Sequence, residues 1–169
     1  MTIPNPEHLF EQADKLIAPP AAGAPRQVDL RRAVSSAYYG VFHATLAAAA
    51  DLFVGRTKRS TAQYGLVYRI VDHRSLRALC IEVAKSNLPA KYTPYQPPNG
   101  FRSHIKAFAA AAVDLQEKRH GADYDPLIRI KISDALAVVS TARSAVRRFG
   151  RASATQRNAF LSLLIFSQR

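Results

Sequence analysis

Tryptophan is absent from the 169 residues, and cysteine occurs once, at Cys80. A single cysteine cannot form a disulfide within the chain and does not make a metal cluster by itself. Glycine is scarce, with seven residues, which excludes a collagen-like or glycine-rich repeat. No apolar run approaches the roughly 20 residues that span a bilayer, and LSLLIF at 161–166 is too short. The first residues carry acids and no basic region, so they predict no secretory signal. We expect a cytoplasmic protein without a membrane segment.

Acidic residues are also few. Twelve Asp and Glu stand against 24 Lys and Arg, which gives a formal net charge of +12. A cationic balance of this size favours a polyanionic partner, such as nucleic acid, a nucleotide, an anionic lipid or an acidic protein. The alternative is an arginine-rich composition on a solvated surface. Two cationic clusters stand out: Arg56, Lys58, Arg59, Arg69, Arg74 and Arg77, and, after the last acid at Asp134, Arg143, Arg147, Arg148, Arg151, Arg157 and Arg169.

The length predicts one domain, residues 1–169, and the hydrophobic fraction of 48% is that of a folded protein. Apolar residues recur with helical spacing and nowhere alternate with a period of two, so we expect an all-α bundle of five or six helices with its core in 29–149. The expected helices are 6–17 capped by Asn5, 29–54 capped by Asp29, 61–85, 101–119, 133–149 starting at Ser133 and stopped by Gly150, and a short tail helix in 150–169.

The segment 61–85 should not be one straight helix. Leu66, Val67, Ile70 and Val71 cluster on one face, whereas Leu76, Leu79, Cys80 and Val83 cluster on nearly the opposite face. We therefore predict a break near Asp72–Ser75, with Asp72 or Ser75 as a cap. The tail is expected to bury Phe160, Leu163, Leu164 and Phe166, and the helix 133–149 to turn Leu136 inward.

Arg119 is a candidate site residue because it falls on the same helical line as Phe101, Phe108 and Ala112. A charge at the end of an apolar stripe must reach water or find a partner, here Asp123 or Asp125. One interpretation is a structural latch between two helices. The other is a ligand site that contains Arg119, His120, Asp123 and Tyr124.

A second candidate set lies on the helix 29–54. Arg31, Ser35, Tyr39 and His43 are spaced by four residues and make a polar flank beside Arg32 and Ser36. Arginine and histidine can bind a phosphodiester and move protons, and tyrosine can stack on a base. Hydrogen-bonded or core-packed side chains are the alternative. No two of the five histidines are four residues apart and no phosphate-loop, dinucleotide or zinc-protease motif is present, so we predict no metal and no cofactor.

Four segments together resemble the HEPN superfamily, in particular small bacterial HEPN-like proteins with an AYYxxFH helix and an RxxADY turn. They are LRRAVSSAYYGVFHA (30–44), VDHRSLRALC (71–80), DLQEKRHGADYDP (114–126) and KISDALAVV (131–139), and the resemblance covers roughly 29–149. It implies a helical bundle, commonly a dimer in which residues of two protomers converge. Many members are metal-independent endoribonucleases in toxin–antitoxin, CRISPR and abortive-infection systems, and others accompany a minimal nucleotidyltransferase.

The ribonuclease motif of that family is an arginine followed, after four to six residues, by a histidine. Four residues separate Arg119 from Tyr124, and no arginine–histidine pair has the required spacing. A phenol is a poor general base at neutral pH. We therefore predict no catalytic residue and assign Arg119, Asp123 and Tyr124 to structure or ligand binding.

Three hypotheses follow. The first is a non-catalytic, homodimeric binding module for RNA, a nucleotide or a partner protein, in a toxin–antitoxin, stress or defence setting. The second is an atypical metal-independent endoribonuclease that uses Arg119 with His120 or His43. The third is an accessory protein of a minimal nucleotidyltransferase, whose basic face meets an acidic partner.

Overall fold

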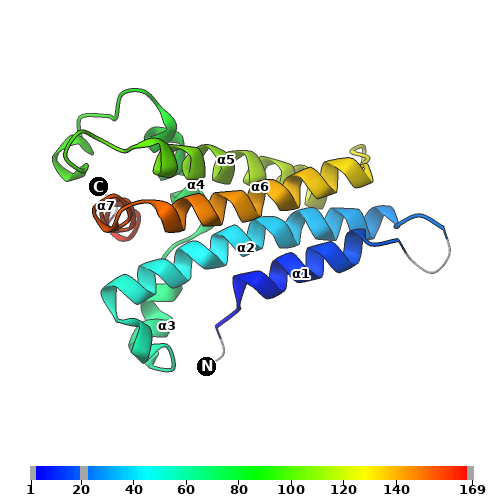
Figure 1. Cartoon of the computed structure of the whole chain (residues 1–169), viewed down its shortest axis with the longest axis horizontal. Coiled ribbons are helices and arrows are strands. Elements are labelled where there is room, and N and C mark those ends of the chain that lie inside the picture. Colours follow the sequence, from blue (N-terminus) through cyan, green and yellow to red (C-terminus); the bar gives the residue numbers. More distant parts are fainter. Residues whose placement is uncertain (1–2, 20–22, 167–169) are drawn as a thin grey trace.

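The computed structural model describes residues 3–19 and 23–166, and within them the chain is helical throughout (Figure 1). This described part contains seven α-helices, two short 3-10 turns and no strand, which confirms the all-α fold. Arg169 of the second cationic cluster lies outside the described residues. The helices are α1 (Pro6–Ile17), α2 (Gln27–Phe53), α3 (Ala62–Tyr68), α4 (His73–Ala84), α5 (Ser103–Tyr124), α6 (Ile132–Arg151) and α7 (Ala154–Ile165).

The long helix α2 runs through the middle of the bundle and organises the other elements. It contacts α1, α3, α5, α6 and α7, while α4 packs against α5 (Figure 1). Its buried side includes Leu30, Val34, Tyr38, Val41 and Leu46. One end of the molecule therefore gathers the start of α2, the end of α5 and the start of α6, where the candidate site residues lie.

Side-chain caps explain several helix starts. Asn5 accepts a hydrogen bond from the backbone N–H of Glu7, with Pro6 in the first turn, which confirms the predicted start of α1. Asp72 accepts from the N–H of Ser75, which confirms the predicted break and divides 61–85 into α3 and α4. The predicted tail helix is α7, capped by Ser153, and the division of 61–85 brings the number of α-helices in the described residues to seven rather than five or six.

Four predicted helix termini are wrong. Asp29 lies in the first turn of α2, where its carboxylate accepts from Arg26, and Ser133 lies inside α6, which begins at Ile132. Gly150 does not stop α6, which continues to Arg151. The helix α5 extends five residues past 119, to Tyr124, because the first strong stop is Pro126, which forces Asp125 out of the helical region.

Four predicted core positions are exposed. Leu66 and Ile70 face solvent because α3 is short and turns Tyr64 and Tyr68 inward instead. Leu136 is 51% exposed near the start of α6, and Phe166 is exposed after α7, where its ring meets Phe53 at 5.3 Å. Phe160, Leu163 and Leu164 are buried as predicted.

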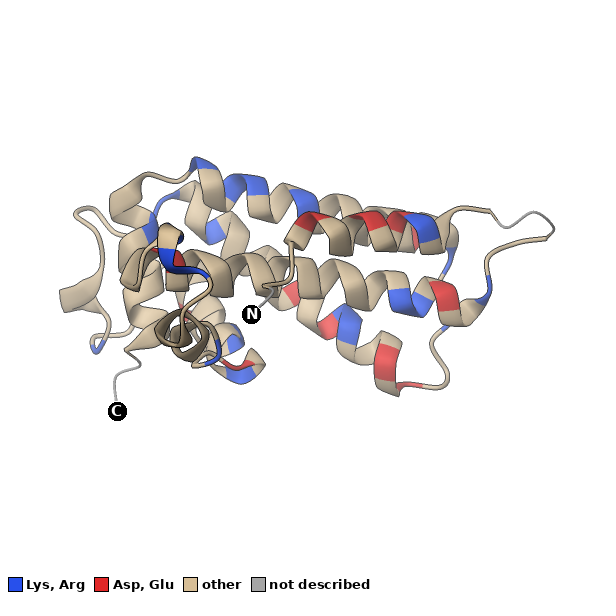
Figure 2. Ribbon diagram, turned by 90° about the horizontal axis from the view of Figure 1, so that it is seen from below, with Lys and Arg blue, Asp and Glu red and all other residues tan. Residues whose placement is uncertain are grey.

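Charge is distributed unevenly over the surface, as Figure 2 shows. Arg143 of α6 pairs with Glu7 and Asp14 of α1, at 2.6 Å and 2.5 Å. Farther along α6, Arg147 and Arg148 are exposed and have no carboxylate partner among the described residues. In the described part of the chain, no helix has the length and apolar character that crossing a membrane requires.

Candidate functional site

A groove with a volume of about 450 Å³ lies between the first turns of α2 and the last turn of α5. It brings together six of the eight predicted site residues: Arg31, Arg32, Tyr39, Arg119, Asp123 and Tyr124. Val28, Ser35 and Ala122 complete its lining. His43 and His120 do not line this groove.

Arg119 occupies the centre of a polar network in the groove. Its side chain is only 15% exposed, and its Nε lies 2.7 Å from Oδ2 of Asp123. Nε is buried and makes no hydrogen bond, so this contact is an ion pair, while Nη2 donates to the hydroxyl of Tyr39 at 3.0 Å. Burial by itself would lower the pKa of Arg119, but Tyr39, Asp123 and Tyr124 act in the opposite sense and the net shift is upward. The guanidinium therefore stays charged.

Asp123 links the two helices that form the groove. One carboxylate oxygen pairs with Arg119 on its own helix, and the other accepts from the hydroxyl of Ser35 on α2. Asp125, the alternative partner that the sequence offers, instead accepts from the backbone N–H of Leu127 at 2.8 Å. The latch expected from the sequence thus runs through Asp123, and it sits inside the groove rather than apart from it.

Arg31 and Arg32 are adjacent in the chain, but their side chains have different surroundings. Arg31 donates to the backbone carbonyls of Ala122, Asp125 and Ile128. The carbonyls of Ala122 and Asp125 lie at the end of α5, the negative end of its dipole, and the carbonyl of Ile128 lies in the connection to α6. Arg31 therefore fastens the α5–α6 connection to α2. Arg32 is exposed and has no carboxylate partner among the residues that the structure describes. Its guanidinium is available to a ligand.

His43 belongs to a neighbouring aromatic cluster that the sequence did not reveal. Its Nδ1 lies 2.7 Å from the hydroxyl of Tyr68, and His73 makes the equivalent contact with Tyr38 at 2.8 Å. Burial lowers the pKa of both imidazoles; His73 lowers that of His43 further, and the charge of Arg119 lowers that of His73. Both histidines are therefore held neutral.

Tyr39 contacts both this aromatic cluster and Arg119. Its ring lies 5.7 Å from that of His73, while its hydroxyl receives the hydrogen bond from Arg119. The sequence did not identify His73 as part of this cluster, because His73 contacts Tyr38 of α2, which is 35 positions away in the chain. Sequence spacing on one helix carries no information about such a contact.

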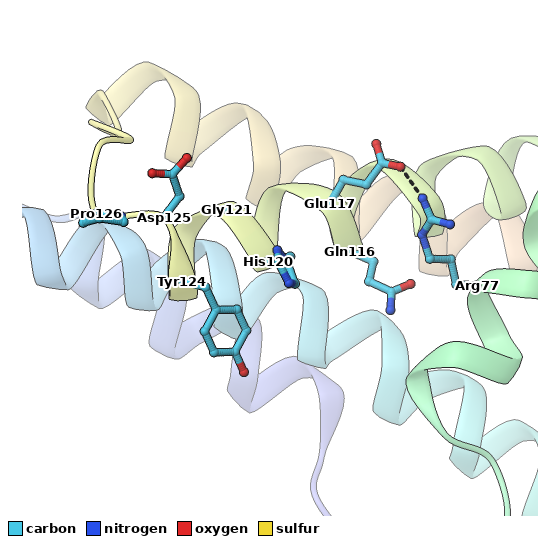
Figure 3. Close-up of a pocket in the computed structure, with 8 residues that line it drawn as sticks. All are labelled: Arg77, Gln116, Glu117, His120, Gly121, Tyr124, Asp125 and Pro126. Carbon is cyan, nitrogen blue, oxygen red and sulfur yellow. Dashed lines mark hydrogen bonds and ion pairs between the residues drawn. The ribbon is translucent and has the colours of Figure 1, made fainter.

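His120 faces a second groove, on the other side of Tyr124. This groove has a volume of about 750 Å³ and is lined by Arg77, Gln116, Glu117, His120, Gly121, Tyr124, Asp125 and Pro126 (Figure 3). The rings of His120 and Tyr124 lie 5.0 Å apart, and Arg77 donates to Glu117 at 2.5 Å. His120 and Arg119, although adjacent, thus line different grooves.

Among the described residues, no group of three or more His, Cys, Asp or Glu side chains is placed to hold a metal ion. Cys80 is buried in the core, and burial raises the pKa of its thiol. Comparisons of the chain with protein-family models, with curated proteins and with solved structures find no match. The geometry of the grooves is therefore the basis for a functional proposal.

Proposed function

We propose that the protein is a HEPN-like, non-catalytic binding module for a phosphate-bearing ligand, an RNA or a nucleotide, and that the groove between α2 and α5 receives the phosphate. The observation that carries this proposal is the charge of the groove. Its lining contains three guanidinium groups, on Arg31, Arg32 and Arg119, and one carboxylate, on Asp123.

The three arginines contribute in different ways. The charges of Arg31 and Arg119 are fixed in place by the backbone carbonyls and by Asp123, so they set the potential of the groove without moving. Arg32 is the side chain that can form a new charge-assisted hydrogen bond with a phosphate oxygen. A preorganised positive groove with one free guanidinium favours a phosphate over an uncharged ligand.

The contacts of Arg119 favour binding over cleavage. Its guanidinium is engaged by the hydroxyl of Tyr39, the carboxylate of Asp123 and the ring of Tyr124. A metal-independent ribonuclease of the kind that the resemblance implies would place an imidazole there as a general base. His120 and His43, the two imidazoles considered for that role, have other neighbours.

We further propose that the module is a cytoplasmic homodimer in a toxin–antitoxin or related defence setting, as the HEPN resemblance implies. Exposed aliphatic side chains beside the groove support the dimer. They are Val28, Leu127, Ile128, Ile132 and Leu136. Exposed aliphatic residues that gather at one end of a molecule are typical of an interaction site.

The first prediction concerns Arg32. Replacing it with alanine should weaken the binding of a fluorescein-labelled single-stranded RNA about three- to tenfold at low salt, because one phosphate contact is lost. The slope of log Kd against log salt concentration should fall by about one. Fluorescence anisotropy titrations between about 50 and 200 mM salt measure both quantities.

Arg147→Ala is the matched control, because Arg147 is also exposed but lies on α6, away from the groove. It should leave the affinity nearly unchanged. An equal loss in the two variants would mean that the RNA binds by general charge rather than in the groove. Failure of the wild-type protein to bind RNA or nucleotide at low salt would refute the proposed function.

A further inference from the structure

Tyr124 forms a ridge between the two grooves at the end of α5. We propose that its ring is a stacking platform for a nucleobase, so that a single-stranded RNA crosses this ridge with a phosphate in the α2–α5 groove and the adjoining base in the groove of Figure 3. This inference rests on the proposed function and names the ligand class and the second subsite.

The ring of Tyr124 is exposed and has two side-chain neighbours. It is 64% exposed and lines both grooves. The guanidinium of Arg119 lies 5.6 Å from the ring centroid, and the ring of His120, tilted by 53°, lies 5.0 Å away. The rest of this exposed ring is open to solvent, where a nucleobase can stack on an aromatic side chain.

The two grooves differ in charge, and this difference indicates which of them would bind the phosphate of a nucleotide and which the base. The α2–α5 groove has three guanidinium groups and one carboxylate. In the second groove the guanidinium of Arg77 is already paired with Glu117, and Asp125 adds a further carboxylate. A phosphate is therefore attracted to the first groove, whereas an uncharged base suits the second.

The second groove also contains side chains that can form hydrogen bonds, and they recur every four residues along α5. Gln116, His120 and Tyr124 are four residues apart, and Figure 3 shows their side chains on the same side of α5. Eight residues of helix separate Gln116 from Tyr124 by about 12 Å. The amide nitrogen of Gln116 donates to the carbonyl of His73, so the amide oxygen of Gln116 keeps its capacity to accept. A base on Tyr124 would have His120 as its near polar neighbour, with Gln116 farther along the same groove.

The form of the nucleic acid follows from this arrangement. Bases in a duplex are stacked on each other, so their faces are not open to an aromatic side chain. A single strand can splay one base onto Tyr124 while its backbone follows the arginines. Single-stranded RNA is therefore the proposed ligand.

The experiment compares hexaadenylate with an abasic hexamer that carries the same number of phosphates. Stacking of one base should make hexaadenylate bind about tenfold more tightly than the abasic strand. Tyr124→Ala should abolish the difference in affinity between the two strands, and Tyr124→Phe should restore it. Tyr95→Ala is the matched control, because Tyr95 is also exposed but lies in the 3-10 turn Thr93–Tyr95, between α4 and α5.

Each outcome decides a separate claim. Equal binding of the two strands to the wild-type protein would overturn the stacking platform and leave the phosphate groove standing. The same loss for both strands in Tyr124→Ala, with circular dichroism unchanged, would also overturn it. A blunt-ended duplex that binds as tightly as hexaadenylate would overturn the choice of a single strand. If neither strand binds, the proposed function fails together with the inference.

Discussion

Arg119 illustrates how a charge is kept inside a helical bundle. Removing a guanidinium from water is unfavourable unless its charge and its donors find partners. Here Asp123 supplies the opposite charge and Tyr39 accepts one hydrogen bond, while Ser35 holds the second oxygen of Asp123. The same contacts that stabilise the fold therefore fix the charge of the groove.

At the scale of the residue, we predict that Arg119→Ala lowers the free energy of unfolding by about 2 kcal/mol, because Asp123 is left half-buried without its counter-charge. Chemical denaturation followed by circular dichroism measures the change. Lys118→Ala is the control: the Lys118–Asp114 pair lies on the adjoining solvent-facing side of α5, and its loss should cost less than about 0.5 kcal/mol. An unchanged midpoint for Arg119→Ala would show that its side chain is solvated.

Among the elements, α1 and α2 pack unusually closely at one point. Gly40 of α2 faces the ring of Phe10, and a Cβ built at Gly40 would overlap that ring. Phe10 is buried and has little room to move. The glycine is therefore required by the approach of a neighbouring helix, not by the conformation of its own backbone.

We predict opposite effects for two glycine-to-alanine changes in helices. Gly40→Ala should destabilise the protein by about 1–3 kcal/mol, because the overlap with Phe10 outweighs the better helix propensity of alanine. Gly150→Ala should stabilise it by up to about 1 kcal/mol, because Gly150 lies within α6 and a Cβ there meets nothing within 4 Å. Thermal unfolding of the two variants tests the pair. A destabilised Gly150→Ala would mean that α6 does not continue past this position.

For the whole molecule, the polar groove and the exposed aliphatic residues occupy the same end of the bundle. Leu127 is 88% exposed in the α5–α6 connection, and Leu136 lies on α6 nearby in the chain. A leucine side chain left in water lacks the favourable free energy that burial of its apolar surface would provide. Their position beside the groove is the reason to expect a second copy at this end.

We predict that the Leu127→Ser/Leu136→Ser double variant shifts the protein from dimer to monomer, because it removes apolar area from the proposed interface. Analytical ultracentrifugation over a range of concentrations measures the equilibrium. Leu66→Ser is the control, since the exposure of Leu66, 67%, lies between those of Leu136 and Leu127, but Leu66 is on α3 at the other end of the bundle. A monomeric wild-type protein, or a dimer that survives the double variant, would contradict the proposal.

Patterns in the sequence correctly predicted the features that depend on residues close together in the chain. The helical class, the Asn5 and Asp72 caps and the burial of the tail leucines follow from periodicity and from short-range hydrogen bonds. The four-residue spacing also placed Arg31, Ser35 and Tyr39 on one face, and all three line the groove. The sequence alone therefore determined which side chains each helix presents together.

Tertiary packing decided what those faces meet. It turned the tyrosines of α3 inward instead of Leu66 and Ile70, committed Arg31 to the end of α5, and joined His43 and His73 to the tyrosines Tyr68 and Tyr38. It also put Arg119 and His120 into separate grooves. The physical reason is that a periodic pattern fixes the direction of a side chain around its own helix axis, whereas its partners depend on how distant helices pack to bury the most apolar surface.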